Sequence, residues 1–249
     1  MLGKIRQASD PQARQHQAYA TAIAEEYEAV MVNGIQNHER SQQKLIGPSE
    51  IGVPCDRALL YKLAQAPERN RGPAWKPAVG TACHAQQDEW FSKIETSGTT
   101  PNDWFTEEKV SVGTIGPDTI KGSTDLFAKS GAVIDHKFVG KFKLDLVKAH
   151  DDPGPQYRVQ AHTYGRGWEL EGWPVHIVMI VFHPRDGELS DSYYWWEPYD
   201  PAIPAAALKR ANERYALLTA FGLQQALSLF PYCTDKFCDW CRRDQPYAG

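Results

Sequence analysis

Residues 132–139, AVIDHKFV, constrain the fold more than any other segment of this chain. The run is apolar on both faces of an extended strand, as expected of a central strand that other elements cover on each side. Asp135 and Lys137 interrupt it, and because side chains alternate along a strand, both lie on one face. Burying such a pair is costly unless both charges are compensated. The segment therefore predicts a central strand that carries a polar site.

The order of the elements expected around this strand indicates the fold class. The expected strands are residues 105–114, 119–128, 132–139, 174–183 and 190–197. The expected helices are one or two amphipathic helices within residues 9–40, a short helix within 49–65, and helices at 76–95, 155–170 and 201–229. This order favours an α/β fold, a sheet with helices on both faces.

The turn between the second and third strands decides whether two carboxylates face each other. If residues 129–131 (KSG) form a three-residue loop, Ala128 pairs with Ala132, and Asp125 falls opposite Asp135. Opposed residues on antiparallel strands have Cβ atoms about 5 Å apart and share a face. Two carboxylates placed in this way repel each other unless a divalent cation lies between them.

Two alternatives remain open from the residues alone. A two-residue loop would place Leu126 opposite Asp135, and the two carboxylates would lie on different faces. The other alternative contains no metal: Asp135 and Lys137 form an internal ion pair, and Asp125 is a surface residue.

The bulk properties of the chain limit its class. It has 249 residues, of which 42% are hydrophobic and 23% charged, as in ordinary globular proteins. No apolar run approaches the length of a membrane span, and the N-terminus MLGKIRQASD lacks the apolar core of a signal peptide, so we expect a cytoplasmic protein without a membrane partner. The formal charge of −4 argues against a chain wrapped in nucleic acid but is compatible with a nuclease.

Four of the five cysteines have a spacing that is typical of metal ligands. Cys233, Cys238 and Cys241 form a C-x4-C-x2-C pattern, and Cys55 lies far upstream. The cytoplasm keeps thiols reduced, so structural disulfides are not expected. Such thiolates suit either an iron–sulfur cluster or tetrahedral zinc, and the spacing does not separate the two. Cys83 is expected to be a small apolar core residue.

Four short motifs, in this order and spacing, resemble the core of the PD-(D/E)XK nuclease superfamily. Residues 80–84 (GTACH) resemble the G-x-x-x-H element of its RecB-like branch. Asp125 resembles the first acidic residue of the core, and residues 135–137 (DHK) resemble its D-x-K motif. Residues 160–164 (QAHTY) resemble the Q-x-x-x-Y helix of the RecB-like branch.

One cysteine before this core and three after it is the arrangement of the iron–sulfur exonuclease branch, which includes the CRISPR-associated exonuclease and compact phage-encoded relatives. The resemblance covers residues 49–243. It implies a restriction-endonuclease-like mixed central sheet flanked by helices, with N- and C-terminal segments joined by the four-cysteine cluster. Residues 1–48 would form a helical segment, residues 49–243 a single nuclease domain, and residues 244–249 a tail.

The resemblance also implies roles for the motif residues. Asp125 and Asp135 would bind Mg²⁺ or Mn²⁺, with the backbone carbonyl of His136 and the imidazole of His84 as further ligands. Because imidazole suits Mn²⁺ better than Mg²⁺, we expect higher activity with Mn²⁺. Lys137 would orient or deprotonate the attacking water and offset negative charge.

Further polar residues lie within or beside these motifs. Gln160 and Tyr164 are four residues apart on a helix and would position the lysine and the DNA backbone. Glu108 matches an acidic position in several relatives, but a solvated charge explains it equally well, and it stays outside the expected site. A run of lysines would track phosphates or line a solvated helix face: Lys137, Lys141, Lys143 and Lys148.

Together these inferences predict a metal-dependent DNA exonuclease that acts on single-stranded DNA or DNA ends in recombination, repair or end processing. The expected cofactors are Mn²⁺ or Mg²⁺ and a 4Fe–4S cluster, with structural Zn²⁺ as the alternative. A structure-specific or nicking endonuclease and an inactive DNA-end-binding module are the competing hypotheses. Expected partners are DNA, recombination or CRISPR-adaptation proteins, and further copies of the chain, since some relatives form homo-oligomers around DNA.

Overall fold

The structure, a computed structural model, describes residues 7, 11–38, 45–67, 74–93, 103–235 and 238–244. It divides into two compact units, residues 1–44 with 68–79 and residues 45–67 with 80–249. Most of the expected tail, residues 245–249, lies outside the described residues. Within the described ranges, no helix has both the length and the apolar character that crossing a bilayer requires.

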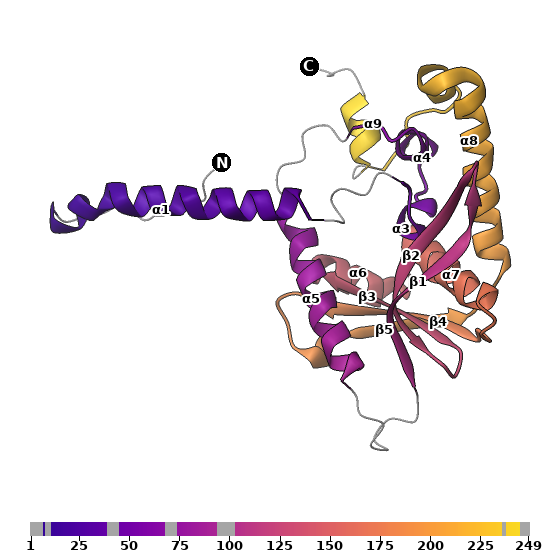
Figure 1. The fold of residues 1–249 in the computed structure, drawn as a ribbon, viewed down its shortest axis with the longest axis horizontal. Helices are drawn as coiled ribbons and strands as arrows, with labels where there is room; N and C mark the ends of the chain where they lie inside the picture. Colours follow the sequence, from indigo (N-terminus) through magenta and orange to yellow (C-terminus); the bar gives the residue numbers. More distant parts are fainter. Residues whose placement is uncertain are drawn as a thin grey trace. The chain divides into compact units, whose positions relative to one another are not determined.

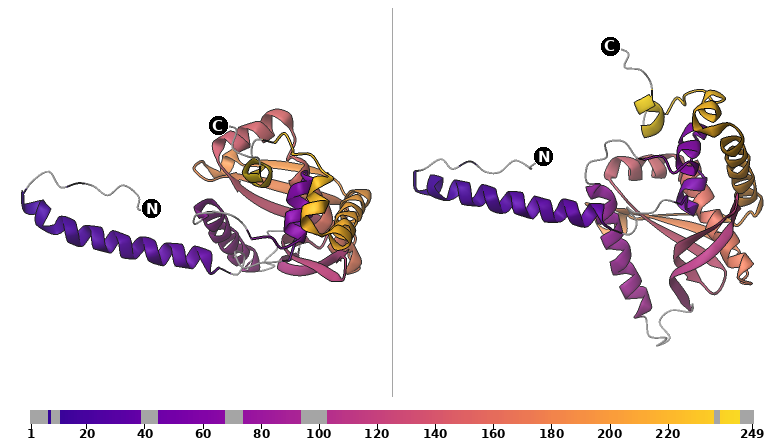
Figure 2. Two further views of the ribbon diagram at one scale, coloured as in Figure 1. Left: turned by 90° about the horizontal axis from the view of Figure 1, so that it is seen from above. Right: turned by 45° about the horizontal axis from the view of Figure 1, so that its top comes forward.

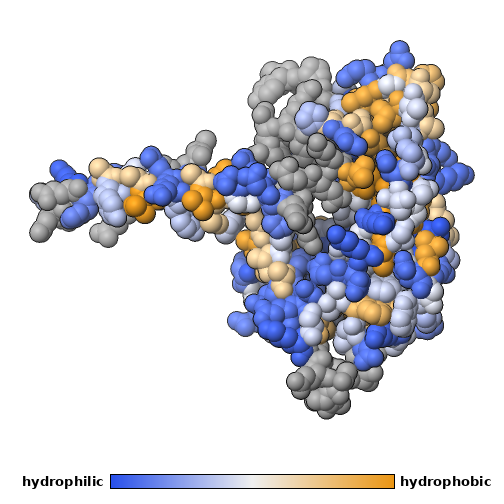
Figure 3. Space-filling view, viewed as in Figure 1, coloured by the Kyte–Doolittle hydropathy of each residue, from blue (hydrophilic) through white to orange (hydrophobic). Residues whose placement is uncertain are grey.

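The first unit contains α1 (Pro11–Gln36), a helix of 26 residues in the region where amphipathic helices were expected. Figure 3 shows hydrophobic and hydrophilic residues side by side along its surface. Among its described side chains, four large apolar ones are exposed: Tyr19, Ile23, Tyr27 and Val30.

The second unit is built on a five-stranded sheet with the strand order β1-β2-β3-β4-β5 (Figure 1). The strands are β1 (Trp104–Ile115), β2 (Asp118–Ala128), β3 (Ala132–Val139), β4 (Ile177–Pro184) and β5 (Tyr193–Pro198). β3 and β4 are parallel, whereas all other neighbours are antiparallel, so the sheet is mixed. A parallel pair needs a crossover connection, which helices provide here.

The helices lie on both sides of this sheet, as Figures 1 and 2 show. The helices after α1 are α3 (Pro48–Ile51), α4 (Asp56–Leu63), α5 (Trp75–Ser92), α6 (Lys141–His150), α7 (Pro155–Leu170), the 3-10 helix η1 (Leu189–Asp191), α8 (Ala202–Ser228) and α9 (Asp239–Asp244). Of these, α4 packs against α8 and α9. Trp168 of α7 stacks on Phe127, with ring centroids 4.3 Å apart. Phe91 of α5 contacts His136, whose side chain points to the opposite face. The expected α/β class, a mixed sheet flanked by helices, is confirmed.

Two helical features differ from the sequence prediction. Helix α6, directly after β3, was not predicted, because Gly140 caps it without a side-chain hydrogen bond and its first turn has no acidic residue. Helix α8 was predicted without interruption, but Gly222 breaks it with φ of 74° and ψ of 166°. No atom of the described residues lies within 4 Å of a Cβ built at Gly222, so the break reflects the backbone freedom of glycine.

The β2–β3 turn is a three-residue loop, the form that was expected to bring Asp125 and Asp135 onto one face of the sheet. Ala128 pairs with Ala132, the N–H of Gly131 donates to the carbonyl of Ala128 at 2.8 Å, and Gly131 has φ of 105°. The pairing of β2 with β3 ends at Leu126 and Ile134, whereas β3 stays paired with β4 along its whole length. The two strands therefore separate beyond that pair, and the site lies in the resulting fork.

Candidate functional site

Asp125 lies in the fork between β2 and β3 and contacts two other elements. Its Oδ2 accepts a hydrogen bond from the backbone N–H of His136 at 2.7 Å, and its Oδ1 is 3.2 Å from Nδ1 of His84 on α5. The register places Phe127 opposite Val133, so strand alternation puts Asp125 on the same face as Asp135. Asp125 is not a surface residue, since only 11% of its side chain is exposed.

Asp135 is almost fully buried and is held by two side chains. It forms an ion pair with Lys137, and its Oδ1 accepts a hydrogen bond from Nε2 of Gln160 at 2.9 Å. The internal ion pair considered as an alternative therefore exists, together with the nearby second carboxylate of Asp125. Tyr164, the other residue of the Q-x-x-x-Y motif, is buried in the hydrophobic core.

A third acidic residue, Glu107 of β1, lies at the site and was not predicted from the sequence. Ligand atoms of His84, Glu107 and Asp125 all lie within 4.8 Å of one another. These three residues and His136 line one small pocket. Asp135 is not a member of this three-residue set, because its oxygens face Lys137 and Gln160 instead.

A bulge in β1 explains why Glu107, rather than the neighbouring Glu108, joins the site. The β1–β2 register shifts between Ser111 and Gly113, and beyond the shift Glu108 pairs with Thr124. Without the shift, counting back from the turn would put Glu108 opposite Asp125. Glu107 has φ of 48°, an uncommon conformation for a residue with a side chain, and Glu108 is exposed.

Burial and nearby charges shift the pKa values of the two aspartates in the fork in opposite directions. Burial raises the pKa of Asp135 to about 6, the charge of Lys137 opposes the rise, and the charge of Asp125 adds to it. Burial also acts to raise the pKa of Asp125, but the hydrogen bond and charge of His84, with the charge of Lys137, lower it overall. Burial alone would lower the pKa of Lys137, yet the two carboxylates raise it. Lys137 is therefore held as a cation.

The three-residue set suits a divalent cation. One imidazole nitrogen and two carboxylate oxygens are ligands that Mn²⁺ accepts readily, whereas Mg²⁺ prefers oxygen alone. Two carboxylates so close together in a partly buried place repel each other, and a cation between them would remove the repulsion. The residues of this site thus fit a metal ion, with Glu107 as an additional ligand.

His136 links the fork to a histidine on β4. Its Nδ1 is 3.3 Å from Nε2 of His183, and Nδ1 of His183 is 2.9 Å from Oγ of Ser192. Burial lowers the pKa of His136 to about 4, so the ring is neutral at physiological pH. These contacts fix the orientation of the His136 ring, and the same residue's N–H holds Asp125.

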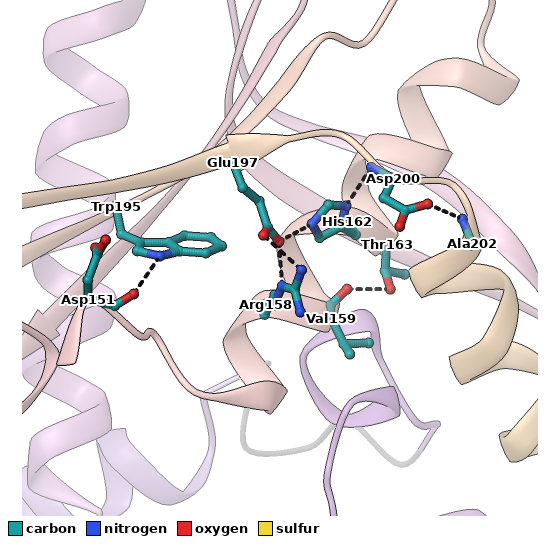
Figure 4. Close-up of polar contacts among 9 residues, drawn as sticks. All are labelled: Asp151, Arg158, Val159, His162, Thr163, Trp195, Glu197, Asp200 and Ala202. Carbon is teal, nitrogen blue, oxygen red and sulfur yellow. Dashed lines mark hydrogen bonds and ion pairs between the residues drawn. The ribbon is translucent and has the colours of Figure 1, made fainter.

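Arg158 and His162 anchor α7 to Glu197 of β5 (Figure 4). Arg158 makes two hydrogen bonds to Glu197, at 2.5 and 2.8 Å, and Nε2 of His162 is 2.6 Å from the same carboxylate. Nδ1 of the fully buried His162 accepts the N–H of Asp200 at 3.1 Å, so its Nε2 carries the proton. This network fixes the position of α7, from which Gln160 reaches Asp135.

Four cysteines come together, as the sequence predicted: the Sγ atoms of Cys55, Cys233, Cys238 and Cys241 all lie within 4.8 Å of one another. Cys55 precedes α4, and Cys241 lies in α9, so the cluster joins the two ends of the second unit. Cys83 is not part of it. Burial raises the pKa of the Cys55 thiol to about 11, outweighing the N–H of Ala58 at the helix start. A bound cation would be needed to hold the thiolate at neutral pH.

The distances between the four sulfur atoms bear on which metal group the cysteines could hold. With metal–sulfur distances of about 2.3 Å, sulfurs in a tetrahedral zinc site lie about 3.8 Å apart. Sγ of Cys55 is 3.4 Å from Sγ of Cys241, and the other pairs lie within 4.8 Å. These separations are compatible with one tetrahedral ion; the cysteine sulfurs of a 4Fe–4S cluster bind separate iron atoms and lie farther apart.

The loop that carries Cys55 is held in place by arginines of α8. Arg210 donates to the carboxylate of Asp56 and to the carbonyls of Val53 and Pro54, at 2.8 to 3.1 Å. Arg214 donates to the same carboxylate at 2.9 Å. Cys55 is therefore positioned by contacts that do not involve the other cysteines.

Comparison with known proteins gives a structural likeness only. No family model matches the chain, and no curated protein matches it. The structure of an alkaline exonuclease (LHK-Exo) from Laribacter hongkongensis is similar, with a TM-score of 0.50 and 12% identity, covering 75% of this chain and 91% of that one. LHK-Exo in complex with dAMP gives a TM-score of 0.49 and 14% identity over the same shares. The first likeness shows that the chain shares the fold of this alkaline exonuclease.

Proposed function

We propose that this protein is a metal-dependent DNA nuclease that hydrolyses phosphodiester bonds. The observation that carries the proposal is the convergence of two unequal buried carboxylates, Asp125 and Asp135, with the buried cation Lys137 in one strand fork. The fold shared with an alkaline exonuclease supports it.

The metal would be held by His84, Glu107 and Asp125, whose ligand atoms lie close enough to share one ion. Asp135 and the backbone carbonyl of His136 are the further ligands that we propose. Bound Mn²⁺ or Mg²⁺ would polarise the scissile phosphate and lower the pKa of a water molecule. The imidazole of His84 favours Mn²⁺.

The chain's own side chains would supply positioning and charge. Lys137, held protonated by the two carboxylates, would orient the attacking water and offset the negative charge that develops on the phosphate. Gln160 would keep Asp135 in place through its hydrogen bond. Tyr164, from the core, would support the helix that carries Gln160.

The mode of cleavage is a finer proposal. We favour an exonuclease on single-stranded DNA or DNA ends, as the name of the similar alkaline exonuclease suggests. A nicking or structure-specific endonuclease is the alternative on the same scaffold, and an inactive DNA-end-binding module is the alternative without catalysis. The three charged residues of the fork favour catalysis.

The wider setting is proposed from the sequence and from its resemblance to the nuclease superfamily. Residues 49–243 would form the nuclease domain, residues 1–48 a helical segment, and residues 244–249 a tail. The protein would act in the cytoplasm, in recombination, repair or end processing, with DNA and recombination or CRISPR-adaptation proteins as partners. It would assemble as a homo-oligomer.

For the cysteine cluster we propose a structural role. The sequence resemblance favours a 4Fe–4S cluster, whereas the sulfur separations favour a single zinc ion. Either group would tie Cys55 to the C-terminal segment across the nuclease core, which constrains the unfolded chain.

The test measures degradation of linear and circular single-stranded DNA with Mn²⁺, Mg²⁺ or a chelator. Asp135→Asn and Lys137→Met should abolish degradation, while Asp145→Asn on exposed α6 serves as a matched control and should leave it unchanged. Circular dichroism would verify that the variants fold. Undiminished degradation by the fork variants would contradict the proposal. Cutting of circular DNA would favour the endonuclease alternative.

A further inference from the structure

The lysines of the central strand β3 and of α6 differ in their surroundings. Three of them have polar partners: Lys137 with Asp135, Lys141 with Asp145, and Lys148 with the carbonyl of Asp191. Lys143 is half-buried on α6 and has no carboxylate partner within the described part of the chain. An ammonium group kept from full hydration and left without a counter-ion is a group that an anion would stabilise.

Lys143 is connected to the fork through one aromatic ring. Its Nζ lies 5.8 Å from the ring centroid of Tyr157, and Nζ of Lys137 lies 5.1 Å from the same centroid. The ring itself packs against Phe182 of β4, with centroids 6.1 Å apart. Because a cation is attracted to an aromatic face, Tyr157 holds both ammonium groups near it. Two positive charges thus lie beside one anchored ring, one in the fork and one next to it.

The backbone around Lys143 adds to the positive potential. Lys143 is in the first turn of α6, and its Nζ is 3.8 Å from a Cβ built at Gly154, the residue that caps the start of α7. Helix starts carry partial positive charge, and neither helix has an acidic residue in its first turn. One carboxylate is close: Asp152 accepts the N–H of Gly154 at 2.8 Å.

We propose that Lys143, with Tyr157 beside it, binds the phosphate next to the scissile phosphate on the same nucleic-acid strand. The inference rests on the proposed nuclease function and adds a subsite to it. Lys137 faces the reacting phosphate, and the neighbouring phosphate enters the half-buried place where Lys143 has no carboxylate partner among the residues that the structure describes. A partly buried charge is screened less than an exposed one, so this single contact contributes more than the exposed lysines do. Lys143 is a positioning residue for the strand.

The experiment tests whether the side chain of Lys143 contacts the phosphate next to the scissile one. Single-stranded DNA is prepared with a neutral methylphosphonate in place of the phosphate next to the scissile one, and KM and kcat are measured for the wild type, Lys143→Met and Lys141→Met. Neutralising that phosphate should raise KM about fivefold for the wild type and for Lys141→Met. For Lys143→Met, the same change in the DNA should raise KM less than about twofold. The values of kcat should stay similar.

A binding measurement separates this inference from the nuclease proposal. With Ca²⁺ in place of Mn²⁺, the salt dependence of DNA affinity should become shallower by about one phosphate contact in Lys143→Met and stay unchanged in Lys141→Met. Equal sensitivity of Lys143→Met and the wild type to the methylphosphonate would overturn the subsite while leaving the nuclease intact. If the salt dependence of DNA affinity changes in Lys143→Met as expected but the wild type degrades no DNA, the nuclease proposal is overturned and the phosphate subsite stands.

Discussion

The carboxylate of Asp125 accepts the backbone N–H of His136 at 2.7 Å, directly beyond the point where β2 and β3 stop pairing. A side chain thereby takes the place of a strand carbonyl and satisfies an amide that the fork would otherwise leave without its β2 partner. The other oxygen of the same carboxylate faces His84. The position of Asp125 is thus set by the protein itself, which is the preorganisation that a metal site requires.

Glu107→Gln should weaken Mn²⁺ binding by about tenfold or more, because it removes one anionic ligand from the set with His84 and Asp125. Isothermal titration calorimetry with Mn²⁺, or the electron paramagnetic resonance signal of free Mn²⁺, would measure the change. Glu108→Gln is the matched control, since Glu108 is the exposed neighbour on the same strand. Equal Mn²⁺ affinities of the two variants would remove Glu107 from the proposed site.

Gly131→Ala should destabilise the fold through the turn that sets the β2–β3 register. Gly131 has φ of 105°, and an added Cβ would lie 2.6 Å from Cδ2 of His176. The control is Gly172→Ala, with φ of 87° and open space around the Cβ. We expect backbone strain of about 1–2 kcal/mol in both variants and a further cost of about 1–3 kcal/mol for the clash in Gly131→Ala alone. Urea unfolding of both variants would measure these costs, and equal losses would contradict the clash.

His162 should make the stability of the protein depend on pH. Burial lowers the pKa of His162 in the folded state, and Glu197 opposes this only in part. As the pH falls through about 6.5, the unfolded chain takes up a proton that the folded chain does not. The free energy of unfolding should therefore be highest above this pH and decrease below it, by up to about 1.4 kcal/mol per pH unit for this one group.

His162→Gln tests the assignment, because the variant cannot titrate there. It should be less stable than the wild type at pH 7.5, where it disturbs the contacts to Glu197 and Asp200, and its stability should fall less between pH 7.5 and 5.5. Urea unfolding at several pH values would provide both slopes. Parallel curves for the two proteins would show that His162 is not the titrating group.

Cys55→Ser should release the group bound by the four cysteines, while Cys83→Ser should retain it, since Cys83 lies outside the cluster. Iron, sulfide and zinc are measured on protein purified without oxygen. Brown protein with iron and sulfide would identify an iron–sulfur cluster, and colourless protein with one zinc per chain would identify a zinc site. Loss of the group should lower the free energy of unfolding by a few kcal/mol, as the loss of a long loop closure would. Unchanged metal content in Cys55→Ser would contradict the cluster.

Local periodicity and turn chemistry were enough to predict several parts of the structure. The apolar strand with Asp135 and Lys137, the three-residue turn ending in Gly131, and the cysteine spacing were all readable, because strand alternation and turn geometry act over a few residues. The mixed sheet and the meeting of four cysteines followed from these patterns together with the family resemblance, and both are confirmed.

The acidic residue of β1 that enters the fork could be identified only from the three-dimensional structure. A bulge near Gly113 shifts the register by one residue, so Glu107 rather than Glu108 meets Asp125, and a shift of one residue exchanges the two faces of a strand. The structure likewise separated Lys143 from its neighbouring lysines, since charge compensation depends on residues distant in sequence. Registers and partners of this kind arise from long-range packing, which no local pattern encodes.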